Sequence, residues 1–140
     1  MIEQIKKICD GLNFDNQATL LCLDLWILAQ AWDDVVDDNG PTDLAIKKAA
    51  IDLPINQYYV NYNIVAEVAK AHAKWVTANE YEKSKVNIDK AYMLRAAYYD
   101  ILLHVYLCQH GHESLPIASK FIYDCYGETL EDLKEELKNA

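Results

Sequence analysis

The sequence predicts an all-α protein: a compact single-domain bundle of five or six helices over residues 1–140. Apolar residues recur at helical spacing along most of the chain. Only four Gly and three Pro occur, which argues against an all-β fold dense in turns. A chain of 140 residues also has the usual size of one domain and buries enough surface to fold without disulfides or metals.

The N-terminal part of the chain predicts two helices. Residues 2–10 carry apolar side chains at helical spacing, and Gly11 ends this first helix. Asp15 or Asn16 can cap the second helix, which runs to about Asp38. Because the second helix is apolar around much of its girth, we expect it at the centre of the bundle.

The middle of the chain predicts a short helix, a connection and a long helix. Thr42 can cap a helix over 43–52, and Pro54 prevents its continuation. Residues 55–62 are rich in Tyr and Asn and predict an irregular connection. Helical spacing resumes over 63–81, which predicts a fourth helix.

The C-terminal part predicts one buried helix and two shorter ones, after a polar loop at 82–88. Residues 89–110 are apolar around most of the helix, so we expect this segment to pack against the second helix. Gly111 ends it, and Pro116 fits the first turn of a sixth helix. Residues 128–137 place leucines on one side of a short acidic helix.

The net charge, the cysteines and the absence of long apolar stretches limit which partners and which cellular compartment the sequence favours. The net charge of −9 opposes generic binding to nucleic acid and to acidic membranes. The four cysteines are scattered without metal-site spacing and are expected to be free apolar thiols. The N-terminus lacks the apolar run of a signal peptide, and the stretch 20–32 is too short to span a bilayer. We therefore expect a cytoplasmic protein that contacts another protein or a second copy of itself.

Four aspartates at the end of the second helix form the most unusual pattern in the chain: Asp33, Asp34, Asp37 and Asp38. They make like-charge pairs at i, i+4 and lie where the helix dipole favours cations. Local rules broken in this way tend to mark functional sites. The pattern is therefore a candidate site for Mg²⁺ or Ca²⁺, and the alternative is a solvated acidic helix end.

This cluster resembles the aspartate-rich D-D-x-x-D signature of isoprenoid synthases. The resemblance implies carboxylates that hold magnesium against a diphosphate. It covers about twenty residues, and the chain is roughly half the length of such an enzyme. A second aspartate-rich motif is missing from the sequence, and Arg95 is its only arginine.

A broader resemblance is to small helical proteins encoded by phages and prophages, whose role is undetermined. The segments 31–37, 53–59 and 94–102 carry this resemblance, which spans about residues 20–111. It implies a helical fold and a phage or prophage origin, and it supplies no activity.

Four polar residues interrupt apolar helix segments: Asp24, Arg95, Asp100 and His104. An unpartnered buried charge is very costly, so these groups are expected to pair with one another or with Tyr hydroxyls. We expect Asp24 and Arg95 to share one buried hydrogen-bonded network. The alternative is an acid–base or metal site.

Three classes of function are compatible with these features. The first is a phage-type structural or adaptor protein that acts through protein–protein contacts, and it requires an exposed apolar or tyrosine-rich patch. Its tyrosines at 58, 59 and 62 could form that patch or fold back over the core. The second is a Mg-dependent enzyme that acts on a diphosphate or other phosphorylated substrate through Asp33–Asp38, and it requires a cleft beside the cluster. The third is an acidic mimic that occupies a basic surface.

We favour the adaptor. We assign no catalytic residue and no cofactor beyond weak binding of Mg²⁺ or Ca²⁺ at the aspartate cluster.

Overall fold

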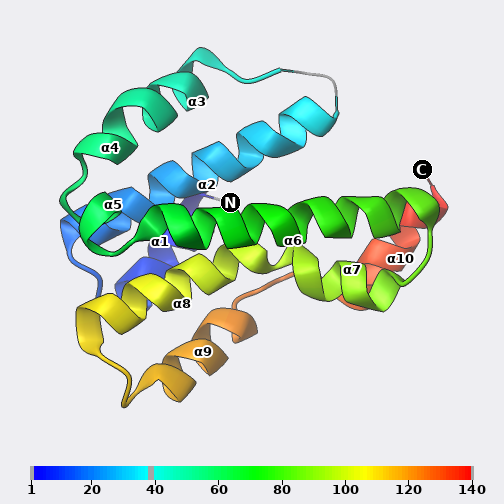
Figure 1. The fold of residues 1–140 in the computed structure, drawn as a ribbon. Helices are drawn as coiled ribbons and strands as arrows, with labels where there is room; N and C mark the ends of the chain where they lie inside the picture. Colours follow the sequence, from blue (N-terminus) through cyan, green and yellow to red (C-terminus); the bar gives the residue numbers. More distant parts are fainter. Residues whose placement is uncertain (1, 38–39, 140) are drawn as a thin grey trace.

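A computed structural model describes residues 2–37 and 40–139, and these residues are almost entirely helical (Figure 1). None of them forms a β-strand, so the predicted all-α class is confirmed. The longer helices are α1 Ile2–Gly11, α2 Asn16–Val36, α6 Ile64–Ser84, α7 Ile88–Arg95, α8 Ala97–His110, α9 Leu115–Asp124 and α10 Leu130–Lys138. The shorter elements are α3 Asp43–Lys47, the π-helical turn η1 Lys48–Asp52, α4 Leu53–Ile55 and α5 Gln57–Asn61.

The predicted helix starts agree with the capping side chains. The Asp15 carboxylate accepts a hydrogen bond from the amide of Ala18 at 2.8 Å, and Thr42 accepts one from Ala45 at 3.1 Å. Each bond satisfies one of the backbone donors that the first turn of a helix leaves free. These two residues therefore define the N-termini of α2 and α3.

The described residues form more helical segments than the five or six predicted. One predicted helix is broken, and another contains a π-helical turn and continues beyond its predicted end. The segment 89–110 divides at Ala96, whose backbone leaves the helical region at φ −82° and ψ 11°. Since Ala is the strongest helix former, helix propensity does not explain this break. The prediction that the helix over 43–52 stops before Pro54 is wrong. The backbone stays helical from α3 through η1 into α4, where Pro54 lies in the first turn.

The predicted irregular connection at 55–62 is also wrong. It contains the helix α5, which the side chain of Asn56 caps by accepting a hydrogen bond from the Tyr58 amide at 3.0 Å. The same Asn56 side chain donates to the carbonyl of Gln17 at 3.0 Å, which fixes α5 against the start of α2. A cap and a long-range contact together stabilise a helix too short to form alone.

The core lies where α1, α2, α6, α8 and α9 meet. Its fully buried side chains include Ile8 of α1, Leu21 of α2, Ile64 of α6, Leu102 of α8 and Ile122 of α9. The N-terminal half of α2 and the part of α8 up to Val105 contribute much of it, whereas Leu107 in the last turn of α8 is 37% exposed. The C-terminal end of α2 is not central, because Val35 and Val36 are each 53% exposed.

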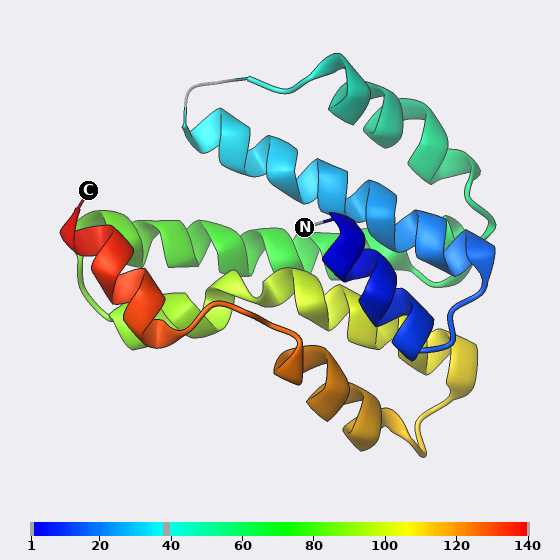
Figure 2. The same ribbon diagram turned by 180° about the vertical axis from the view of Figure 1, so that it is seen from behind.

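Helix α1 packs on the face of the bundle opposite to α6, and the segment α3–α4 lies along the outer side of α2 (Figure 2). Gln4 of α1 donates a hydrogen bond to the carbonyl of Cys125 at 3.1 Å. At Gly11 the Phe121 ring comes so close that an added Cβ would lie 2.4 Å from Phe121 Cζ. Helix α1 therefore packs against the segment around Phe121 and Cys125, more than a hundred residues further along the chain.

Replacing Leu25 by Ala is expected to lower the free energy of unfolding by about 2–5 kcal/mol, because the side chain is 3% exposed and its removal leaves a cavity. Leu28→Ala is the matched control. Both side chains line the same cavity, but Leu28 is only half-buried, so its loss is expected to cost clearly less. Urea denaturation measures both, and a cost under about 1 kcal/mol for Leu25→Ala would contradict the packing of α2.

Candidate functional site

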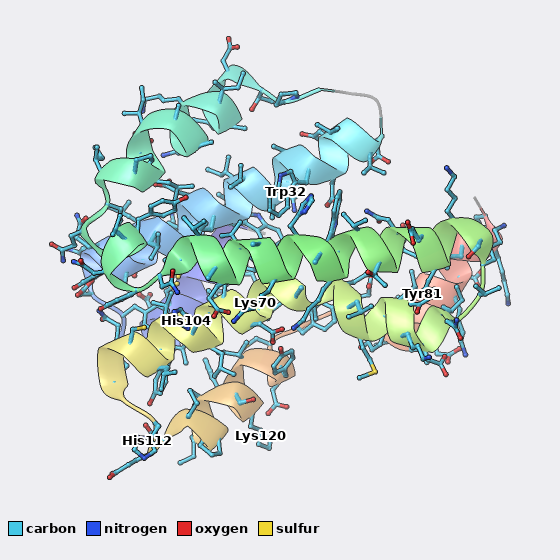
Figure 3. The ribbon with its side chains drawn as sticks, viewed as in Figure 1. Trp32, Lys70, Tyr81, His104, His112 and Lys120 are labelled. Carbon is cyan, nitrogen blue, oxygen red and sulfur yellow. The ribbon has the colours of Figure 1, made fainter. Side chains whose placement is uncertain are left out.

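A cavity of about 910 Å³ lies between α1, α2, α6, the α7–α8 junction and the segment that leads into α10. All three tryptophans of the chain line it: Trp26, Trp32 and Trp75. Figure 3 shows Trp32 on α2, on the side of that helix that faces α6. The Trp32 and Trp75 rings are 6.1 Å apart, so the two long helices meet here through aromatic side chains.

Arg95 lies at the end of this cavity nearest to α10 and joins three carboxylates. Its guanidinium is 2.7 Å from Glu82, 3.2 Å from Glu128 and 3.5 Å from Glu136. The four side chains come from α6, from α7, from the segment before α10 and from α10 itself. Burial raises the pKa of Glu82, and the Arg95 charge opposes that rise. Arg95 therefore holds the C-terminal segment of the chain against α6.

The structure brings part of the aspartate cluster to the same cavity. Asp33 and Asp37 line it, whereas Asp34 does not, and Asp38 lies outside the described residues. The Trp75 indole donates a hydrogen bond to Asp33 at 2.9 Å. Desolvation by the surrounding protein atoms raises the pKa of Asp33, although the residue lies at the exposed rim.

The aspartate pattern does not form a compact ligand set in the part of the chain that the structure describes. There, no three His, Cys, Asp or Glu side chains converge in a way that could hold a metal ion. Asp33 already accepts the Trp75 hydrogen bond on one oxygen. Metal binding at the cluster stays a prediction, which a titration described below tests.

The predicted network that joins Asp24 to Arg95 is wrong. Asp24 is buried and pairs with Lys48 of η1 at 2.9 Å, and Lys48 also pairs with Asp52 at 3.0 Å. Arg95 pairs with the three glutamates described above. Each of these side chains pairs with an opposite charge on an element that packs against its own helix. The sequence does not reveal which elements pack together, so it could not predict these partners.

The other two residues of that expected network also lie in separate contacts. Asp100 pairs with Lys74 at 2.9 Å and accepts a hydrogen bond from Tyr123. His104 donates from Nε2 to the carbonyl of Tyr62 at 2.5 Å, and its Nδ1 lies 3.6 Å from Glu67 (Figure 3). Both contacts join α8 to neighbouring helices and have a structural role.

Two of the tyrosines before α6 fold back over the core. Tyr58 and Tyr62 stack with their ring centroids 4.4 Å apart and nearly parallel. The Tyr58 hydroxyl donates to Asp15, and Gln109 donates to the Tyr62 hydroxyl at 2.5 Å. These rings tie α5 to α2 and α8 and do not form a free aromatic patch.

Exposed aliphatic side chains instead gather on the segment 43–61, which we call the arm. Its exposed members are Leu44, Ile46, Ile51, Ile55 and Val60, with exposed fractions between 52% and 77%. In Figure 1 the arm lies along one edge of the molecule, beside α2 and far from α9. The arm therefore carries five exposed aliphatic side chains, none of which lines the cavity.

Several residues of the cavity carry no recognisable signal in the sequence. The sequence pattern of α6 is that of an ordinary helix face. Its residues Trp75, Asn79 and Glu82 belong to the site only because they lie opposite α2. Arg95 was identifiable as the single arginine. Its partners Glu128 and Glu136 belong to a segment that sequence patterns describe only as acidic.

Comparisons of the chain with protein-family models, with curated proteins and with solved structures found no match. The resemblances to phage proteins and to isoprenoid synthases accordingly stay predictions. Within the described residues, no helix combines the length and the apolar character that crossing a membrane requires.

Proposed function

We propose that the protein is a non-enzymatic adaptor of phage type that acts by contact with another protein. The observation that supports this proposal best is the set of exposed aliphatic side chains on the arm. Ile55 is 77% exposed and Val60 is 75% exposed. Clusters of exposed apolar side chains on a soluble protein mark interaction sites, because water contact with them is unfavourable.

Contacts with α2 hold the arm in place, and an ordered segment is suited to bind a partner. Lys48 pairs with buried Asp24 of α2, and Leu53 is only 1% exposed. Asn56 holds the end of the arm to the first turn of α2. A surface that is already ordered loses less conformational entropy when a partner binds, so more of the contact energy remains as affinity.

The charge of the chain indicates what kind of partner suits this surface. At a net charge of −9, an acidic partner would be repelled and a basic one attracted, whereas a neutral partner would meet no net repulsion. Charge complementarity of this kind raises the rate of association and helps exclude wrong partners. The proposed partner is therefore a protein with an apolar patch in a neutral or basic surround.

Photo-crosslinking in the native host cell tests the adaptor proposal. A photoreactive amino acid replaces Ile55 or Val60, and control positions are Lys134 of α10 and Lys120 of α9, which are exposed elsewhere. We expect a defined crosslinked species from the arm positions and none from the controls. The species should disappear when Ile51→Ser is added on the same arm. Equal crosslinking from all four positions, or from none, would contradict the proposal.

The Mg-dependent enzyme is the second candidate, and one observation favours it. Asp33 and Asp37 line the same cavity as Arg95, the kind of place where a phosphorylated substrate could meet a metal. Two carboxylates from one helix make an open and weak cation site. A dissociation constant in the high micromolar to millimolar range is expected, as in the weaker calcium modules.

Calorimetric titration with Mg²⁺, Mn²⁺ and Ca²⁺ measures this affinity. Asp33→Asn combined with Asp37→Asn should abolish the weak binding. The control pair Glu131→Gln and Glu135→Gln removes the same charge from α10 and should leave it unchanged. Micromolar or tighter binding that only the aspartate pair abolishes would promote the enzyme over the adaptor.

A further inference from the structure

We propose that the cavity binds an organic ammonium ion, whose charged group lies against the indoles of Trp32 and Trp75 and pairs with Asp33 and Asp37. This proposal concerns a different surface from the arm and does not depend on the adaptor function. The cavity of about 910 Å³ is within the range of small-molecule sites, roughly 300–1,000 Å³.

The charges around the cavity favour a cation. Six carboxylates line it, against two cationic side chains, Lys7 and Arg95. Arg95 is occupied by its three glutamates at one end. Within the described part of the chain, no Lys or Arg nitrogen lies within ion-pair distance of Asp33 or Asp37. Both ends of the cavity are therefore net negative, and at the α2 side the two carboxylates have no ion-paired Lys or Arg within the described residues.

Two indoles line the cavity, and that of Trp75 contacts the Asp33 carboxylate. Trp75 donates its indole N–H to one oxygen of Asp33, which fixes the ring beside the carboxylate and leaves the other oxygen free to accept. The Trp32 ring lies 6.1 Å from Trp75 and makes an edge contact with His72 at 4.7 Å. A cation near an indole face gains attraction from the ring quadrupole, and Trp is the strongest such partner.

The remaining wall of the cavity suits an apolar stem. Leu28, Val68 and Ile101 line it beside the buried ring of Tyr98. An alkyl chain several carbons long can lie against these side chains while its ammonium group stays near the rim. Phosphate and carboxylate ligands are disfavoured, because the surrounding carboxylates repel them and Arg95 is already paired.

Intrinsic fluorescence provides the test, because all three tryptophans line the cavity. The full chain is titrated with hexylammonium, with hexanol as the neutral probe of the same shape, and with hexanoate as the anion. We expect saturable quenching by hexylammonium at a concentration at least tenfold below that needed for hexanol, and no saturation with hexanoate. Equal affinity for hexylammonium and hexanol, or a preference for hexanoate, would overturn the proposal.

Variants assign the binding to these side chains. The double substitution Asp33→Asn with Asp37→Asn is nearly isosteric and keeps an acceptor for the Trp75 indole. It should lower the affinity for hexylammonium at least tenfold. The pair Glu131→Gln and Glu135→Gln should leave the affinity unchanged. Calorimetry on Trp32→Leu, with circular dichroism to verify folding, should show a comparable loss. If the aspartate pair and the α10 pair behave alike, general charge attraction explains the signal and the site is rejected.

Two sources could supply the ammonium group, a free amine or a lysine side chain of another protein. A short peptide with one Lys between apolar residues, compared with its Gln counterpart, distinguishes them. Tighter binding of the Lys peptide than of hexylammonium assigns the site to a protein partner, and the reverse order assigns it to a free amine. Failure of every ammonium probe overturns this proposal while the crosslinking result on the arm stays valid.

Discussion

Lys48→Met is expected to lower the free energy of unfolding by about 3–5 kcal/mol, the cost of leaving a buried ion without its partner. Asp24 is 6% exposed and has Lys48 as its cation at 2.9 Å. Methionine fills a similar volume, so the loss reports the charge and not a packing defect. Chemical denaturation at neutral pH measures it.

Lys47→Met is the matched control for this variant. Lys47 also pairs with Asp52, at 3.3 Å, yet its side chain is 59% exposed, so its removal should cost about 1 kcal/mol or less. Hydrogen bonding to Asp24 and Asp52 raises the pKa of Lys48. Its contribution is therefore present at neutral pH and lost only above about 10.4, the ordinary pKa of lysine. Equal small losses for both variants would show that Asp24 does not depend on Lys48.

Arg95→Met is expected to lower the free energy of unfolding by about 3 kcal/mol. This is the lower end of the range for breaking a buried ion pair, because a quarter of the Arg95 side chain is exposed. The substitution leaves Glu82, Glu128 and Glu136 facing one another without a cation. Denaturation at pH 7 and pH 5 is the measurement, with Lys90→Met on the exposed side of α7 as the control.

The deficit of Arg95→Met should be larger at pH 7 than at pH 5. Burial already raises the pKa of Glu82, and Arg95 opposes that rise, so its removal raises this pKa further. A carboxyl whose pKa is higher in the folded than in the unfolded state takes up protons on folding, so stability falls as pH rises. A deficit that is unchanged or larger at pH 5 would contradict the role of the three glutamates.

Combining the two substitutions tests whether the two charge clusters are independent. Lys48 and Arg95 share no partner in the described residues, so their effects should add to within about 0.5 kcal/mol. The single network expected from the sequence would instead couple them strongly. The difference between the effect of the double variant and the sum of the two single effects therefore decides between these two arrangements.

Local signals made most of the fold predictable. The caps at Asp15 and Thr42, the helical spacing of α6 and the stop at Gly111 depend on residues close in sequence. The break at Ala96 and the π-helical turn have no local signal in the sequence, and the helix α5 was not predictable because it depends on a contact with a distant element. Asn56, for example, fixes α5 by reaching the carbonyl of Gln17.

The candidate site was predictable only in part, for the same reason. Asp33 and Asp37 were identified by their spacing and their unfavourable helix position. Trp75 and Glu82 became part of the site because α6 lies opposite α2, which no local pattern shows. Asp24 and Arg95 were correctly expected to need opposite charges, but their partners depend on which elements pack together.

The close approach of Phe121 to Gly11 has a consequence for how the chain folds as it is made. During synthesis α1 emerges before α9, so α1 can meet α2 early. Its contacts through Gly11 with Phe121 and through Gln4 with Cys125 cannot form until those residues have left the ribosome, and the side of α1 that they cover stays open to water until then. Transiently uncovered apolar surface of this kind is where nascent chains aggregate or recruit chaperones. A ribosome stalled before residue 121 would therefore hold a chain whose first helix is docked on one side only.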